Sequence, residues 1–179
     1  ADTTVTRGVL HPLLHENTSD LAEQRFSSHF HGGEFFLTDH RVRGRRTLPG
    51  VAYLEMARAA VCRATGVRTD SAPEPPAVVL QDIAWIRPII VDEASLDVHI
   101  RLLPEQNDRI HLEIYTDAGA DEGGPVIHAQ GTALLVAPQP QPALDLSRLR
   151  TACNRVRLDG AECYQAFGRM GLDYGPAFQ

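Results

Sequence analysis

Apolar residues between positions 51 and 64 recur at helical spacing, and no glycine or proline interrupts them. This pattern predicts a long helix, which Gly66 ends. The apolar side chains form two adjoining stripes, one with Val51, Leu54, Ala57 and Val61 and the other with Tyr53, Met56, Ala60 and Ala64. Because few charged residues interrupt these stripes, we expect the helix to be mostly buried.

Downstream of the helix, the hydrophobic period changes to two. Apolar and polar residues alternate at 96–102 and 110–114, and longer β-branched runs occupy 77–90 and 126–136. Each run predicts an antiparallel strand, with close packing or a bulge at Gly131, and residues 68–76 predict a loop. A twisted sheet around the central helix is the economical way to bury it, so the predicted fold class is α+β.

Upstream of the helix, residues 25–30 and 34–37 predict two short strands, followed by an arginine-rich loop. His29 and His31 flank Phe30, but no third ligand lies at a useful spacing, so we predict no metal site. A separate group of histidines lies on the polar faces of the later predicted strands, where we expect them at the surface: His99, His111 and His128.

The last part of the chain predicts a second unit. We divide the sequence into a domain at 1–137, a proline-rich linker at 138–146 and the start of another unit at 147–179. Ser147 is predicted to cap a short helix, and residues 159–170 are predicted to form a longer one. The chain stops on GLDYGPAFQ, so we expect this second unit to be incomplete.

Composition excludes several classes of function. The 43% hydrophobic and 22% charged residues are typical of a globular protein, and neither a signal pattern nor a membrane-spanning run occurs, so we expect a cytoplasmic protein without a membrane partner. The net charge of −6 argues against a nucleic-acid surface. All 17 basic residues are arginine, which excludes a Schiff-base or P-loop lysine. Three cysteines without a CxxC pair argue against a zinc site or a disulfide framework.

The best candidate for chemistry is His40, which starts a His-x3-Gly-x4-Pro pattern with Gly44 and Pro49. Glycine permits a sharp turn, and proline followed by Gly50 suits the start of the long helix. Backbone N–H groups at a helix start can polarise a carbonyl beside the histidine, which suits proton abstraction alpha to a thioester. On these residues alone, an ordinary loop histidine and an ordinary helix entry remain an equal alternative.

Four motifs carry a resemblance to a known family. They are HPLL at 11–14, the His40-x3-Gly44-x4-Pro49 pattern, LPGVAYLEMARAA at 48–60 and GLDYGPAFQ at 171–179, which contains Tyr174, Gly175 and Pro176. In this order they resemble the dehydratase domain of modular polyketide synthases, which has a double hot-dog fold. The amino-acid sequence of the helix segment is similar to that in synthases that use a free-standing acyltransferase. Residues 1–137 would then be the N-terminal hot dog, an antiparallel sheet around a central helix.

The resemblance implies removal of water from a 3-hydroxyacyl thioester carried on the phosphopantetheine of an acyl carrier protein, without a cofactor of the chain's own. His40 would take the C2 proton as a neutral imidazole, and the Gly50 N–H would bind the thioester oxygen. The acid of the family is an aspartate in the second hot dog, beyond this chain. We therefore expect the chain alone not to be a competent dehydratase and to need a second half, in the same or a separate polypeptide.

Several alternatives remain open at this stage. The arginines of the loop either contact the carrier protein or its phosphopantetheine phosphate, or they form a solvated loop: Arg41, Arg43, Arg45 and Arg46. The chain could instead be a non-catalytic docking module, or a cyclase that closes pyran rings by oxa-Michael addition. Pro49 favours a dehydratase over the double-bond-shifting relatives. The resemblance also leaves a homodimer open.

Overall fold

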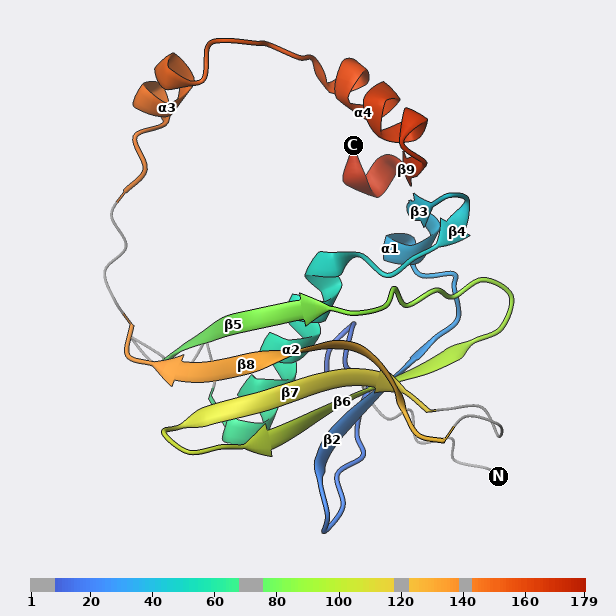
Figure 1. Ribbon diagram of the computed structural model, residues 1–179, viewed down its shortest axis with the longest axis vertical. Helices are drawn as coiled ribbons and strands as arrows, with labels where there is room; N and C mark the ends of the chain where they lie inside the picture. Colours follow the sequence, from blue (N-terminus) through green and yellow to red (C-terminus); the bar gives the residue numbers. More distant parts are fainter. Residues whose placement is uncertain (1–8, 68–75, 118–122, 139–142) are drawn as a thin grey trace, which may run out of the picture.

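The central helix and a curved sheet dominate the structure, a computed structural model that describes residues 9–67, 76–117, 123–138 and 143–179. The sheet has six antiparallel strands. Figure 1 shows it lying across one long helix, α2 (Gly50–Thr65). This is the α+β arrangement that the periodicity predicts. The predicted loop at 68–76 falls outside the described residues except for Pro76, and so does the middle of the predicted linker.

The sheet has the strand order β1-β2-β6-β7-β8-β5. Its strands are β1 (Glu16–Asn17), β2 (Gln24–Phe30), β5 (Ala77–Trp85), β6 (Leu96–Pro104), β7 (Arg109–Thr116) and β8 (Val126–Val136). All four strands predicted downstream of the helix are present. The strand β5 stops at Trp85, well before residue 90, and the chain soon reaches Pro88, which has no N–H to donate to a ladder.

Helix α2 is mostly buried, as predicted, and it ends at Gly66, whose φ of 70° lies in the left-handed region that glycine favours. Two residues of the predicted stripes are exposed, Val51 at 68% and Ala64, whereas Ala52 and Ala59, which belong to neither stripe, are buried. The buried helix residues are Ala52, Tyr53, Met56, Ala57, Ala59, Ala60 and Val61. They pack against the inner face of the sheet, in one core that includes Phe26, Ile100 and Leu112.

The HPLL stretch is anchored to this helix. The His11 Nδ1 accepts a hydrogen bond from the Leu13 backbone N–H at 3.1 Å, and its Nε2 lies 3.1 Å from Glu55 Oε1. The Arg58 guanidinium also binds Glu55 and holds the pKa of that carboxyl below its usual value. His11 therefore shapes the turn with one ring nitrogen and fixes it to α2 with the other.

The segment before His40 is helical, so the prediction of a strand at 34–37 is wrong. Residues Phe35–Thr38 form the short helix α1, in which the N–H groups of Leu37 and Thr38 both bond to the Glu34 carbonyl. Leu37 is buried, and the ring of Phe36 packs edge-on against Phe30. A run of only three apolar residues has no readable period, and the contact with the core decides its conformation.

The arginine-rich segment forms a hairpin and not an irregular loop. Strands β3 (His40–Val42) and β4 (Arg45–Arg46) pair through a two-residue turn at Arg43 and Gly44, with φ values of 51° and 78°. Turns of this kind need positive φ at both central positions, which explains the glycine of the His-x3-Gly-x4-Pro pattern. A third strand, β9 (Leu172–Tyr174), completes a small sheet with the order β4-β3-β9.

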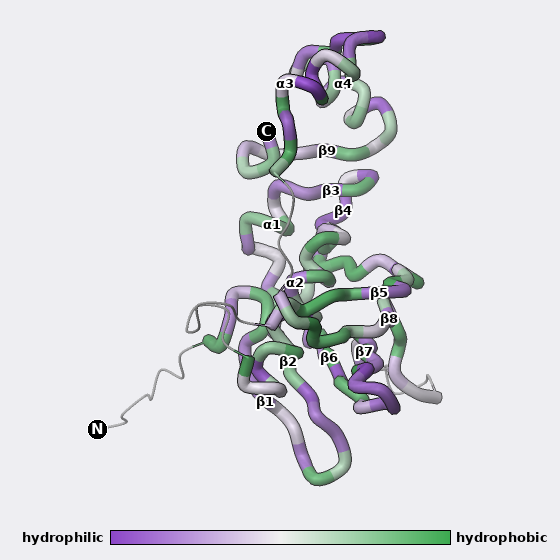
Figure 2. Tube along the Cα trace, turned by 90° about the vertical axis from the view of Figure 1, so that its left-hand side faces the viewer, coloured by the Kyte–Doolittle hydropathy of each residue, from purple (hydrophilic) through white to green (hydrophobic). Residues whose placement is uncertain are grey.

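The C-terminal segment contains helices α3 (Leu146–Ala152) and α4 (Gly160–Arg169) and the 3-10 helix η1 (Pro176–Phe178). The cap of α3 is Asp145, not Ser147 as predicted, because the Asp145 side chain accepts from the Arg148 N–H. Asp159 caps α4 in a capping box with Glu162. Figures 1 and 2 show the two helices away from the large sheet, and in Figure 2 they lie beyond β9, on the side opposite β3. The domain division at 138–146 stays a prediction.

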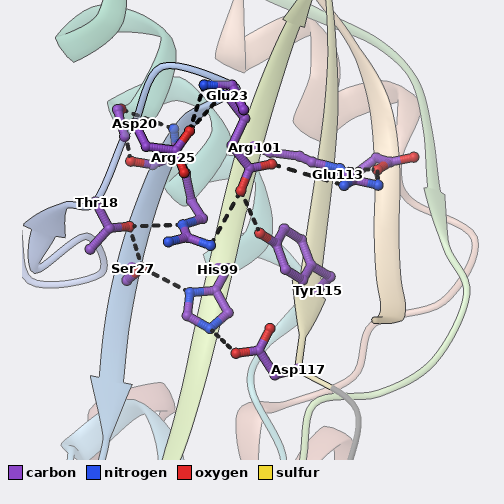
Figure 3. Close-up of polar contacts among 12 residues, drawn as sticks. Thr18, Asp20, Glu23, Arg25, Ser27, His99, Arg101, Glu113, Tyr115 and Asp117 are labelled. Atoms are coloured by element: carbon purple, nitrogen blue, oxygen red, sulfur yellow. Dashed lines mark hydrogen bonds and ion pairs between the residues drawn. The ribbon is translucent and has the colours of Figure 1, made fainter. Parts of the chain in front are cut away.

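Two histidines expected at the surface are buried. His99 and His128 are each 8% exposed, whereas His111 is half-buried. Figure 3 shows why for His99: its Nδ1 lies 2.8 Å from Ser27 Oγ, and its Nε2 lies 3.5 Å from Asp117 Oδ2. Such polar side chains pack across β2, β6 and β7 and cover one another on the outer face of the sheet. Period-two alternation tells which face a residue occupies, but not what covers it.

The predicted irregularity at Gly131 is confirmed. The register between β5 and β8 shifts between Gln81 and Ala84, and Ile83 lies directly against Gly131. A Cβ at Gly131 would meet the side chain of Ile83 and would lie 3.2 Å from the Gln81 carbonyl oxygen. Among the described residues, no helix has the length and apolar character needed to cross a membrane.

Candidate active site

His40 is the first residue of β3, where its imidazole is half-buried. Its Nδ1 lies 2.7 Å from the carbonyl oxygen of Thr47, and because a carbonyl only accepts, Nδ1 must carry the proton in this contact. The Nε2 of a neutral ring then keeps its lone pair. Thr47 is itself held in place, since its N–H bonds to the His40 carbonyl and it forms a β-bridge with Ile90.

Two aromatic rings from the C-terminal segment lie against His40. Tyr174 is its cross-strand partner in β9, with ring centroids 5.5 Å apart, and the Phe178 ring lies at 5.8 Å. The structure therefore brings together at His40 two segments that are more than 130 residues apart in the sequence. Of the predicted motif-supporting residues, Tyr174 contacts His40 directly, and Gly175 and Pro176 form the turn between the two rings.

The start of α2 lies beside His40. Pro49 is its N-cap, with an extended backbone at φ −59° and ψ 141°, and Gly50 is the first helical residue. No acceptor for the Gly50 N–H occurs within the described part of the chain, as expected for the first turn of a helix. The Gly50 carbonyl, by contrast, accepts from the Trp85 ring N–H at 3.2 Å.

One cavity of about 310 Å³ connects the candidate base and the helix start. Its lining residues are His40, Thr47, Leu48, Gly50, Tyr53, Trp85, Ile86, Arg87 and Pro88. The lining is largely apolar, and its polar features include the His40 imidazole, the start of α2 and the residues Thr47 and Arg87. Such a cavity could bind an acyl chain and place a carbonyl near Gly50 and a C–H near His40.

Tyr53 holds one wall of this cavity. Its hydroxyl accepts a buried hydrogen bond from the Ile89 N–H at 2.8 Å, and burial raises the pKa of this phenol to about 12. A second part of the lining, Ile86 and Arg87, is bonded to β8, because the His128 carbonyl accepts from the N–H groups of both residues. The His128 ring is enclosed by Thr116 and by the Arg87 carbonyl, and its burial lowers its pKa.

Sequence reasoning missed most of the cavity wall. Tyr53 belongs to an apolar helix stripe and was assigned only to the core, although its hydroxyl can reach a backbone group. The residues at 86–88 follow β5, and Pro88 was the one signal that the strand ends before them.

The four arginines of the hairpin do not line the cavity. Two of them are engaged by Asp92: the Arg45 Nε donates to its carboxylate at 2.7 Å, and the Arg46 guanidinium donates to its carbonyl at 2.9 Å. The Arg45 contact lowers the pKa of Asp92. Arg41 donates to the Thr38 carbonyl, and the Arg43 backbone bonds to the Gly171 carbonyl.

The described residues contain no group of three side chains able to hold a metal ion. His29 and His31 do lie together, with ring centroids 4.6 Å apart, but the His29 Nδ1 pairs with Asp97 at 2.6 Å.

Comparison with known proteins gives the family. Residues 11–117 match the model of the polyketide synthase dehydratase domain. The chain belongs to this family. The expected resemblance is thereby confirmed, and with it the dehydratase N-terminal hot-dog fold.

The relatives of this dehydratase-family chain are much longer proteins. Polyketide synthase PksM of Bacillus subtilis is 45% identical over 177 residues, which are 99% of this chain but 4% of PksM. Polyketide synthase ThaG of Burkholderia thailandensis is 38% identical over an alignment of 181 positions, which covers 95% of this chain and 3% of ThaG.

Solved dehydratase domains have the same fold. A trans-AT PKS dehydratase domain from Brevibacillus brevis is 50% identical, with a TM-score of 0.86, and the match covers 94% of this chain and 61% of that domain. Two solved variants of the CurK dehydratase are 25% and 26% identical, with TM-scores of 0.77, and each match covers 94% of this chain and 57% of the variant. Both are described as inactive mutants; one replaces a histidine by phenylalanine and the other an aspartate by asparagine.

Proposed function

We propose that this chain supplies the base and the oxyanion site of a dehydratase that removes water from a 3-hydroxyacyl thioester on an acyl carrier protein. The observation that supports the proposal is the shared cavity, whose lining includes both His40 and Gly50, the first residue of α2. The inactive histidine mutant of CurK supports the same assignment by analogy.

The elimination follows from these groups. The Nε2 of His40 takes the C2 proton while Nδ1 stays bonded to the Thr47 carbonyl, which stabilises the imidazolium that forms. The Gly50 N–H and the positive end of the α2 dipole stabilise the negative charge on the thioester oxygen. The C3–O bond then breaks, the double bond forms between C2 and C3, and the hydroxyl leaves as water once an acid protonates it.

We assign that acid to an aspartate outside these 179 residues. Two aspartates lie near His40 in the chain's own fold, and neither suits the role. The Asp39 carboxylate is occupied by the Thr38 hydroxyl and the Ala177 N–H, and the exposed Asp173 is not part of the cavity lining. The inactive aspartate mutant of CurK is consistent with an acid of this type, and the match covers only 57% of that protein.

The first experiment tests the base. A protein containing this chain and its second dehydratase half is incubated with a 3-hydroxyacyl carrier protein, and loss of water is followed by mass spectrometry. We expect His40→Ala to reduce the rate by about 10²- to 10⁴-fold. The exposed His31 provides the matched control His31→Ala. Full activity in His40→Ala would refute the proposal. With a substrate that carries a further hydroxyl, a ring-closed product isomeric with the enoyl thioester would favour the cyclase alternative.

The second experiment removes the oxyanion donor alone. Proline is favoured at the first helical position and lacks an N–H, so Gly50→Pro deletes the proposed donor and keeps the helix. In the control Gly50→Ala the N–H stays, and its Cβ would make an ordinary contact 3.5 Å from the Trp85 ring nitrogen. We expect kcat to fall about 10²- to 10³-fold in Gly50→Pro and to stay near the original value in Gly50→Ala.

The carrier protein is the proposed partner, and the hairpin arginines are proposed to attract it. Because Asp92 engages Arg45 and Arg46, the charges to test are those of Arg41 and Arg43. Reversing both to glutamate should weaken binding of an acidic carrier protein, and the effect should shrink with added salt. The same double reversal at Arg148 and Arg150 on α3 is the control, and equal affinity in the two variants would refute this contact.

A further inference from the structure

Asp39, the residue before His40, is bonded to the C-terminal turn by two independent contacts. Its backbone carbonyl accepts from the Gly175 N–H at 2.8 Å, and its carboxylate Oδ2 accepts from the Ala177 N–H at 2.9 Å. The other carboxylate oxygen accepts from the Thr38 hydroxyl at 3.1 Å, which fixes the side-chain rotamer. Asp39 therefore holds a segment that is distant in sequence from its own position.

The Asp39 carboxylate supplies the capping acceptor at the start of the 3-10 helix η1. The N-cap residue of η1 is Gly175, which has no side chain to accept from the first-turn N–H groups. Asp39 supplies that acceptor from another part of the chain. The missing side chain also makes the space for it, because a Cβ at Gly175 would lie 2.5 Å from the Asp39 Cγ and 2.7 Å from its Oδ1.

The turn that Asp39 holds carries the two rings that lie against His40. Tyr174 precedes Gly175, and Phe178 ends η1, so both are positioned by the contacts at Gly175 and Ala177. Their ring centroids lie 5.5 and 5.8 Å from the His40 ring and 5.8 Å from each other. The single hydrogen bond from Nδ1 to the Thr47 carbonyl leaves the imidazole free to rock about it, and the two rings restrict that movement.

We infer that Asp39 is a positioning residue for the base: it clamps the Gly175–Phe178 turn so that Tyr174 and Phe178 hold the His40 imidazole in its working orientation. This inference rests on the proposed function of His40. The inference extends that function by assigning Asp39 and Gly175 a joint role in the same site. Asp39 itself neither touches substrate nor transfers a proton.

The first test uses this chain alone and requires no activity. In ¹⁵N-labelled protein we expect the Ala177 amide to be protected from hydrogen exchange, and nuclear Overhauser contacts to join the His40 ring to Phe178. Asp39→Ala should lose both, whereas Asp173→Ala, an exposed carboxylate on the same strand as Tyr174, should keep both. Unchanged His40–Phe178 contacts in folded Asp39→Ala would overturn the inference.

The second test uses the protein that also contains the second dehydratase half. Misplacement of a catalytic group affects the chemical step more than binding. At a temperature well below the unfolding midpoint of the variant, we therefore expect Asp39→Ala to lower kcat about tenfold and to change KM less than about twofold. Asp39→Asn keeps one acceptor oxygen, so its kcat should lie between those of the unsubstituted protein and Asp39→Ala. A normal kcat in Asp39→Ala, or a change in KM alone, would overturn the positioning role.

Failure of the two proposals can be told apart. If the unmodified protein and His40→Ala dehydrate equally, the proposed function fails, while the spectroscopic test still decides whether Asp39 orients the ring. If His40→Ala is inactive and Asp39→Ala is fully active, only the role of Asp39 fails.

Discussion

The hydroxyl of Tyr53 offers the most quantitative test of how the cavity wall is built. Tyr53 is 3% exposed, and its oxygen is the acceptor for the buried N–H of Ile89, at 2.8 Å. The substitution Tyr53→Phe keeps the ring in the core and leaves that N–H without a partner. An unsatisfied buried donor costs about 1 to 3 kcal/mol, so we expect a loss of about 2 kcal/mol in the free energy of unfolding. For a chain of this size, that corresponds to a fall in Tm of about 4 to 8 °C.

The pH dependence makes this prediction more specific. Burial raises the pKa of Tyr53 to about 12, from 10 in the unfolded chain. Above pH 10 the unfolded state therefore loses this proton before the folded state does, and the stability of the unsubstituted protein falls by up to about 1.4 kcal/mol per pH unit. Tyr53→Phe has no such proton. The difference in stability should shrink from about 2 kcal/mol at pH 7 to less than about 1 kcal/mol at pH 11.

Urea unfolding followed by circular dichroism measures both quantities. The matched control is Tyr115→Phe, which removes another buried hydroxyl whose contact, to Glu23, is longer at 3.3 Å. Glu23 keeps an ion pair with Arg25 in that variant, so we expect a loss below about 1 kcal/mol. A loss below about 0.5 kcal/mol in Tyr53→Phe at pH 7, or a difference that grows between pH 10 and 11, would refute the reasoning.

Two further predictions concern the sheet. Gly131→Ala should lower the free energy of unfolding in urea by about 1 to 3 kcal/mol, because its Cβ meets Ile83 and the Gln81 carbonyl. At the control position Gly33 a Cβ meets no heavy atom within 4 Å, so Gly33→Ala should lower it by less than about 1 kcal/mol. Equal losses in the two variants would contradict the packing argument. Burial lowers the folded-state pKa of His128, so the unfolded chain binds this proton first and stability should fall as the pH drops below 6.5, by at most about 1.4 kcal/mol per pH unit. His128→Gln should reduce that loss between pH 7.5 and 5.5, and an identical pH dependence in the two proteins would contradict it.

The large sheet and α2 could be predicted because long periodic segments specify both the element and its buried face. The helix α1 could not, since its three apolar residues fit several conformations and the contact of Phe36 with Phe30 decides between them. The hairpin turn was missed for a different reason. Arg43 has a φ of 51°, a backbone conformation that residues other than glycine rarely adopt. Only the pairing of β3 with β4 reveals this turn.

The candidate site divides in the same way. Local motifs pointed to His40 and Gly50, and the structure places both around one cavity. The residues that surround them come from other parts of the chain, and no local pattern links Asp39 to Ala177 or Tyr53 to Ile89. Burial of His99 was unpredictable for a related reason, because its cover comes from Ser27 on a neighbouring strand.

The pairing of β3 with β9 has a consequence for the order in which the protein forms on the ribosome. The core around α2 draws only on residues before 138, so it can fold while the C-terminal segment is still being synthesised. The contact between His40 and Tyr174 closes a very long loop, and such non-local contacts form late. The nascent N-terminal unit would thus emerge with the His40 imidazole still open to solvent, and the rings of Tyr174 and Phe178 would cover it only after they had been synthesised.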